Sequence, residues 1–112
     1  MKKYLLYAMN GKKMCFVHVL LNALDLKEAG NEVKIIFEGE AVKLPPELAK
    51  EENPLYKKAL DKGLIAGVCL ACSHTLGVKD DIEKLNLPLL NDMNGHAGTR
   101  PYMGSGYEVL VF

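Results

Sequence analysis

The sequence predicts one α/β domain built on a doubly wound, mostly parallel sheet of five strands. Short apolar segments alternate along the chain with segments of helical periodicity, which is typical of parallel strands joined by right-handed crossovers. The first apolar segment, residues 4–9, is apolar at every position, so both faces of that strand must be covered. A chain of 112 residues is long enough for one domain with its own core, which we assign to residues 1–112.

A helix is predicted over residues 13–29, directly after the first strand. Apolar residues recur there at the i, i+3, i+4 and i+7 positions of one helix face: Val17, Leu20, Leu21 and Leu24. Gly30 suits the position just past the helix end. Further apolar residues widen this surface: Phe16, Val19, Ala23 and Leu26. Because one sheet face cannot cover so wide a surface, we expect part of the helix to be buried in a homo-oligomer.

The remaining elements are predicted from apolar runs and turn residues. Further strands are predicted at residues 33–37, 64–68, 88–90 and 107–112, and further helices near Pro45, after Asn53 and from Asp80. Asn53 is expected to cap its helix, because Pro54 follows at the first helical position. Residues 94–106 contain four glycines and a proline, which predicts a loop or a broken helix.

We predict the strand order 2-1-3-4-5 for this sheet. In a sheet of that order the connections change direction between the first and third strands, and ligands bind in the crevice at that point. Three segments that follow strands are expected to line the crevice: residues 10–12, 69–74 and 91–96.

The composition excludes several classes of partner. Fourteen lysines and arginines balance fourteen aspartates and glutamates, so we expect no basic surface for nucleic acid. No segment approaches the roughly 20 apolar residues of a membrane span, and the apolar run near the start is too short for an export signal. We therefore expect a cytoplasmic protein with no membrane partner. Its three cysteines then indicate redox, sulfur or metal chemistry.

The most informative motif is a CxxC pair, Cys69 and Cys72, at the end of the third predicted strand. A thiol there lies where open α/β sheets bind their ligands, close to free backbone amides at the start of the next helix. Such amides stabilise the thiolate, which is the reactive form of cysteine. The motif therefore predicts a reactive thiol, and its position alone favours neither cysteine. The alternative is that both cysteines are small buried residues without a chemical role. We expect this kind of burial for Cys15, which lies on the apolar first helix.

A zinc site is one alternative chemistry for this motif. Cys69, Cys72 and His74 could supply three ligands, with His96 or Cys15 as the fourth. The spacing is incomplete, because a structural zinc site usually adds a second CxxC or a paired histidine motif. We therefore predict that the protein binds no metal.

Other chemistries have less support in the residues. A thioredoxin-like motif would follow an early strand and begin a long helix, whereas this motif comes late and Gly77 soon ends its helix. A reversible disulfide within the CxxC pair is still compatible with the spacing. No phosphate-binding or flavin-binding loop follows the first strand, so no organic cofactor is expected. His96 either contacts a bound anion or accepts a proton, or is an exposed loop residue. We interpret Glu38 and Glu40 as solvated charges at a strand end.

The chain resembles the DsrE/DsrF-like family of sulfur-relay proteins along essentially its whole length. The most specific match is Cys69 at a strand end, followed eight residues later by Gly77. The resemblance implies a flavodoxin-like fold, assembly into oligomers that are often trimers or hexamers, and sulfur carried as a persulfide on Cys69. Cys72 matches a second cysteine that some members have, and Leu76 stands where many relatives have arginine.

The residues and the resemblance together lead us to expect a cytoplasmic sulfur-relay protein. Cys69 would accept sulfane sulfur as a persulfide and pass it on, with Cys72 as an assisting or resolving thiol. Its partners would be sulfur donors and acceptors, either proteins or small persulfides, and further copies of the chain in a trimer or hexamer. Two alternatives stay open: a noncatalytic subunit that binds a small ligand or serves assembly, and a CxxC dithiol that senses redox state or metal.

Overall fold

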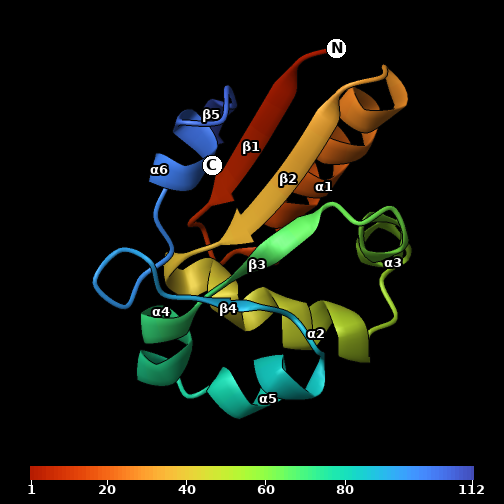
Figure 1. Ribbon diagram of the computed structural model, residues 1–112. Coiled ribbons are helices and arrows are strands. Elements are labelled where there is room, and N and C mark those ends of the chain that lie inside the picture. Colours follow the sequence, from red (N-terminus) through yellow and green to blue (C-terminus); the bar gives the residue numbers. More distant parts are fainter.

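Five parallel strands form one sheet in the computed structural model, which describes residues 1–112 (Figure 1). The strands are β1 (Lys3–Ala8), β2 (Glu32–Phe37), β3 (Ile65–Cys69), β4 (Leu89–Leu90) and β5 (Glu108–Val111). The helices are α1 (Lys13–Glu28), α2 (Leu44–Lys50), α3 (Pro54–Asp61), α4 (Leu70–Thr75), α5 (Lys79–Lys84) and α6 (Arg100–Met103), and a 3-10 helix, η1, spans Gly39–Lys43. The predicted α/β class and flavodoxin-like architecture are therefore confirmed, and the glycine-rich segment contains the short helix α6.

The strand order is β4-β3-β2-β1-β5, so the predicted order 2-1-3-4-5 is wrong. β2 lies at the centre of the sheet, between β1 and β3, and β5 lies on the outer side of β1. β1 ends in four buried residues and β2 in three, so their apolar character did not reveal which of them is central. Because β2 separates β1 from β3, the predicted crevice between those two strands is absent.

The helix α1 packs on β1, β2 and α3, and its buried residues face this core. These residues are Phe16, Val19, Leu20 and Ala23. The ring of Phe16 lies 4.9 Å from that of Phe37 in β2, measured between centroids. On the outer side, Met14 is 80% exposed and Leu21 is 46% exposed. The exposed apolar surface of α1 is therefore narrower than the sequence predicted, because the sheet and α3 cover most of the helix.

Residues 91–99, which we call the strap, follow β4 and pass over the ends of the neighbouring strands (Figure 1). Because β5 pairs with β1, the chain that leaves β4 must cross β3 and β2 before it reaches the far side of β1. The Ala71 amide donates a hydrogen bond to the Gly95 carbonyl at 2.9 Å. The Tyr7 hydroxyl donates another to the Ala97 carbonyl at 2.6 Å. These bonds hold the strap against the ends of β1 and β3.

Helix caps agree with the sequence prediction at two places. The Asn53 side chain accepts hydrogen bonds from the Leu55 and Tyr56 amides at 3.0 and 3.1 Å, and so caps α3. Gly30 follows α1 with a φ of +94°, a conformation that glycine adopts without strain. Among all the helices, none has the length and apolar character needed to cross a membrane.

Gly67 of β3 allows β4 to approach closely. A Cβ atom at this position would lie 2.8 Å from the Pro88 carbonyl oxygen and 2.7 Å from Cγ of Leu90. We therefore expect Gly67→Ala to push β4 away and to lower the free energy of unfolding by about 1–3 kcal/mol, the usual cost of overpacking. Urea unfolding followed by circular dichroism measures this change. Gly104→Ala is the matched control, because a Cβ there lies 3.4 Å from its nearest neighbour. Equal losses in both variants would contradict the role given to Gly67.

Candidate functional site

Cys69 is the last residue of β3 and also the N-cap of α4. Its Sγ accepts a hydrogen bond from the Cys72 amide at 3.3 Å. The CxxC spacing produces this bond, because the third residue of a helix directs its amide toward the N-cap side chain. Ser73 donates its hydroxyl to the Cys69 carbonyl at 2.6 Å. The local sequence therefore fixes the sulfur of Cys69 at the end of the strand.

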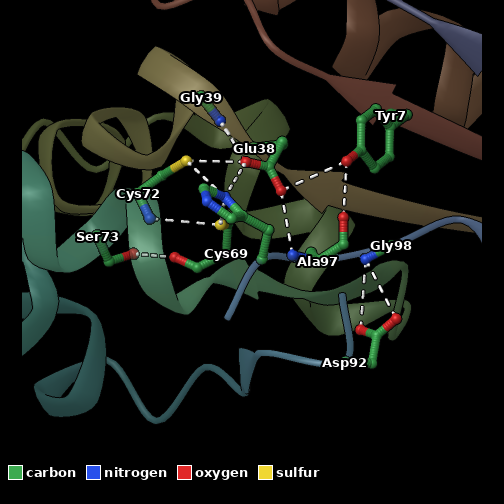
Figure 2. Close-up of polar contacts among 10 residues, drawn as sticks. Tyr7, Glu38, Gly39, Cys69, Cys72, Ser73, Asp92, Ala97 and Gly98 are labelled. Carbon is green, nitrogen blue, oxygen red and sulfur yellow. Dashed lines mark hydrogen bonds and ion pairs between the residues drawn. The ribbon is translucent and has the colours of Figure 1, made fainter. Parts of the chain in front are cut away.

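Glu38 brings a buried carboxylate to the same place, because it directly follows β2, the neighbour of β3 (Figure 2). Glu38 is only 4% exposed. One oxygen, Oε1, accepts hydrogen bonds from the Gly39 amide at 3.1 Å and from the Cys72 thiol at 2.8 Å. The other, Oε2, accepts from the Ala97 amide at 3.1 Å and, more weakly, from the Tyr7 hydroxyl at 3.4 Å, because that hydroxyl shares its single proton with the Ala97 carbonyl. Both carboxylate oxygens thus have donors.

His96 of the strap completes the group. Its Nδ1 lies 3.3 Å from Cys69 Sγ and 3.5 Å from Cys72 Sγ. The same atom lies 3.4 Å from Glu38 Oε1. The donor atoms of the four side chains all lie within 4.8 Å of one another. We call these four residues the thiol cluster: Glu38, Cys69, Cys72 and His96.

The charges in the thiol cluster are distributed unequally. Burial opposes ionisation of Glu38, but hydrogen bonds, above all that from Cys72, outweigh it and hold the pKa of Glu38 below its ordinary value. Burial and the hydrogen bond to Glu38 raise the pKa of Cys72 to about 12. Burial also raises the pKa of Tyr7, and the Glu38 charge adds to that effect. Glu38 is therefore the anion in this group, and Cys72 and Tyr7 keep their protons.

The two thiols differ in exposure. Cys69 is fully buried, with no exposed surface, whereas Cys72 is half-buried and lines an open pocket of about 280 Å³. The other residues that line this pocket are Gly39, Glu40, Thr75, Leu76 and His96. A molecule that enters the pocket therefore meets Cys72 and His96 before it reaches the sulfur of Cys69.

The structure brings together three of the residues that the sequence singled out: Cys69, Cys72 and His96. His74 is exposed on α4 and lies outside the thiol cluster. Cys15 is exposed, so its predicted burial is wrong: Phe16 and Val19 of α1 face the core, and Cys15 does not. Residues 10–12 contribute nothing to the cluster, because β2 and not β1 is the neighbour of β3.

Glu38 is the functional residue that the sequence interpretation missed, since it is buried and not solvated. In the predicted order β2 would have been an edge strand, and a charge at its end would have faced water. Its position directly after an apolar strand was the available signal, because ligands gather at such strand ends. Glu38 also supplies the fourth donor that the CxxC spacing lacked, so the reason for predicting no metal does not hold for the folded chain.

The fold and the site define a class: a small parallel α/β domain with a dithiol, a histidine and a buried carboxylate at the strand ends. The chain belongs to the same family as MJ0733, an uncharacterized protein of Methanocaldococcus jannaschii. The two are 42% identical over 97 residues, which cover 84% of this chain and 77% of that protein. An uncharacterized protein of Archaeoglobus fulgidus is 37% identical over 49 residues, which cover 44% of this chain and 80% of that protein. No family model matches the chain, and no solved structure matches it.

We expect Glu38→Gln to make Cys72 react at lower pH. The substitution removes the negative charge that accepts the thiol proton, so the pKa of Cys72 falls and its thiolate fraction near neutral pH rises. The rate of alkylation against pH measures this in metal-free protein that also carries Cys15→Ser and Cys69→Ser, where Cys72 is the only thiol. Glu40→Gln is the control, because Glu40 lines the pocket without bonding to Cys72. Identical pH profiles for the two variants would show that Glu38 does not control this thiol.

Proposed function

We propose that the protein accepts sulfane sulfur as a persulfide on Cys69 and passes it on. One observation carries this proposal: the Cys69 sulfur is fixed at a strand end, 3.3 Å from an amide donor and 3.3 Å from the His96 Nδ1. Amide donors and a protonated imidazole stabilise the thiolate, which is the nucleophile in sulfur transfer. The resemblance to DsrE/DsrF-like proteins supports the same assignment for Cys69.

The proposed transfer needs no oxidant or reductant. The Cys69 thiolate attacks the outer sulfur of a donor persulfide, so that a new S–S bond forms while the donor's S–S bond breaks and the donor leaves as a thiolate. An acceptor thiolate then attacks the outer sulfur on Cys69, and Cys69 leaves as a thiolate. His96 is placed to hold the proton that Cys69 gives up before the first attack. No organic cofactor takes part in either step.

Cys72 and Glu38 have a protective role in this proposal. A Cys72 thiolate would attack the inner sulfur of the loaded Cys69, form a disulfide with it and expel hydrosulfide. That reaction would release the bound sulfane sulfur before it reached an acceptor. Since burial and Glu38 raise the pKa of Cys72 to about 12, its thiol stays protonated near neutral pH and this attack is slow. Glu38 thereby lets a second thiol lie beside the persulfide without destroying it.

The pocket sets the kind of donor and acceptor that we propose. Because Cys69 is buried, a partner must present a thiol or persulfide narrow enough to pass Cys72 and His96, either as a small molecule or on a protruding protein segment. We also propose a cytoplasmic location. The free thiols support it, because cysteines stay reduced in that compartment.

We expect Cys69→Ser to abolish sulfur loading. The measurement is the intact mass of each protein after incubation with a small persulfide donor under non-reducing conditions. The wild type and the control Cys15→Ser should gain sulfur, because Cys15 lies outside the thiol cluster. Cys72→Ser should also gain sulfur and should hold it longer, because the route to the disulfide is removed.

Other outcomes of that experiment would assign the site differently. Loading that survives in Cys69→Ser and disappears in Cys72→Ser would reverse the roles of the two thiols. Loss of two hydrogens from the wild type, with no gain of sulfur, would favour a redox dithiol. Folding of each variant is checked by circular dichroism.

We also propose that the chain forms a homo-oligomer, a trimer or hexamer, through α1. Met14 and Leu21 are 80% and 46% exposed. They lie seven residues apart, which is two helical turns, and so share one side of α1. Leu60 of α3, which packs against α1, is 39% exposed. Burying these side chains between chains would stabilise the assembly by about 25 cal/mol for each Å² of apolar surface removed from water.

We expect light scattering to report a mass several times that of one 12.4 kDa chain. Leu21→Glu should lower this mass, because it places a charge in the interface. Lys27→Glu is the control, since Lys27 is exposed on another side of α1. Phe16 and Leu20 are unsuitable for this test, because both lie in the core of the single chain. A mass of one chain for the wild type, unchanged on dilution, would refute the proposed assembly.

A further inference from the structure

We infer that Glu38, Cys69, Cys72 and His96 form a binding site for a thiophilic divalent cation, with Zn²⁺ the best match. Cysteine sulfur, imidazole nitrogen and carboxylate oxygen are the ligands that zinc takes, usually four in number. Two thiolates also favour zinc over magnesium or calcium, which prefer oxygen ligands. The site depends only on this donor set, so it does not rest on the proposed sulfur transfer.

The distances from His96 Nδ1 to the other three donor atoms fit one tetrahedral ion, and all four donor atoms lie within 4.8 Å of one another. With Zn–S bonds near 2.3 Å and Zn–N bonds near 2.0–2.1 Å, tetrahedral angles hold the ligand atoms about 3.3–3.8 Å apart. Nδ1 of His96 lies 3.3 and 3.5 Å from the two sulfurs and 3.4 Å from Glu38 Oε1. The Cys72 sulfur is closer to Glu38 Oε1, at 2.8 Å, because the thiol proton joins them. Zinc would replace this proton, and the two atoms would separate by less than about 1 Å.

Surrounding hydrogen bonds orient the donors. Glu38 Oε2 is occupied by the Ala97 amide and the Tyr7 hydroxyl, which leaves Oε1 directed at the sulfur and nitrogen atoms. The Cys69 sulfur is held by the Cys72 amide. Partners of this kind fix ligand geometry in metal sites and raise metal affinity. The site is therefore largely organised before any ion binds.

A bound ion would join three parts of the chain: the end of β2, the CxxC turn and the strap. Four protein ligands leave no open position, which is typical of structural or regulatory zinc and not of catalytic zinc. Because both sulfurs would be ligands, zinc and a persulfide on Cys69 would exclude each other.

The test begins with the full chain, reduced and treated with chelator, and titrates it with Co²⁺ and then Zn²⁺. Co²⁺ bound to thiolates gives a charge-transfer absorption band, and Zn²⁺ should displace it at one ion per chain. Native mass spectrometry counts the bound zinc. Binding of one zinc per chain, with loss of the cobalt band, is the expected result. Absence of stoichiometric zinc binding by the wild type would overturn the proposal.

Variants then identify the ligands. We expect His96→Ala and Cys72→Ser to weaken zinc binding at least about 10-fold, since even outer-shell partners of a metal contribute that much. Both residues are only partly buried, so these variants should fold, and circular dichroism checks this. His74→Ala and Cys15→Ser are matched controls, because both residues are exposed and lie outside the thiol cluster. Unchanged affinity in the first pair, or loss of binding in the controls, would overturn the assignment whether or not sulfur is transferred.

Discussion

Burial of the Glu38 carboxylate is the constraint on which the arrangement of the site depends. A buried carboxylate without donors would take up a proton or would destabilise the fold by several kcal/mol. Its donors come from four places: the Gly39 amide after β2, the Cys72 thiol of α4, the Tyr7 hydroxyl of β1 and the Ala97 amide of the strap. Each of these elements must therefore take up its position for the charge to be accommodated.

The residues that the sequence could place were those fixed by local rules. The strands were found from apolar runs, the cap at Asn53 from residue type, and Cys69 and Cys72 from their spacing at a strand end. Glu38 could not be placed in this way, because its role depends on which strand lies beside β3. That neighbour is set by pairing between distant segments, such as Phe37 with Val68. Local periodicity in the sequence carries no information about such pairing. The strap brought His96 to the thiols for the same nonlocal reason.

Two chemically identical side chains have become different through their surroundings. The Cys69 sulfur accepts a hydrogen bond from a backbone amide, whereas the Cys72 thiol donates to a carboxylate at 2.8 Å. One sulfur is therefore a hydrogen-bond acceptor and the other a donor, and burial together with the bond to Glu38 raises the pKa of Cys72 to about 12. Since both sulfurs lie beside the same histidine nitrogen, the difference arises from their hydrogen bonds and not from their distance to His96. The spacing alone could not reveal this difference.

The anchoring of the strap has a consequence for access to the buried sulfur. The strap is held at one end by β4, a strand of two residues, and at the other by α6, a helix of four. Segments with so little regular structure open locally at a smaller free-energy cost than the whole fold. Opening would withdraw His96 and the Ala97 amide from Glu38 and let water hydrate the carboxylate. The frequency with which the strap opens locally, more than the width of the pocket in the closed structure, would then determine how often Cys69 is exposed to solvent.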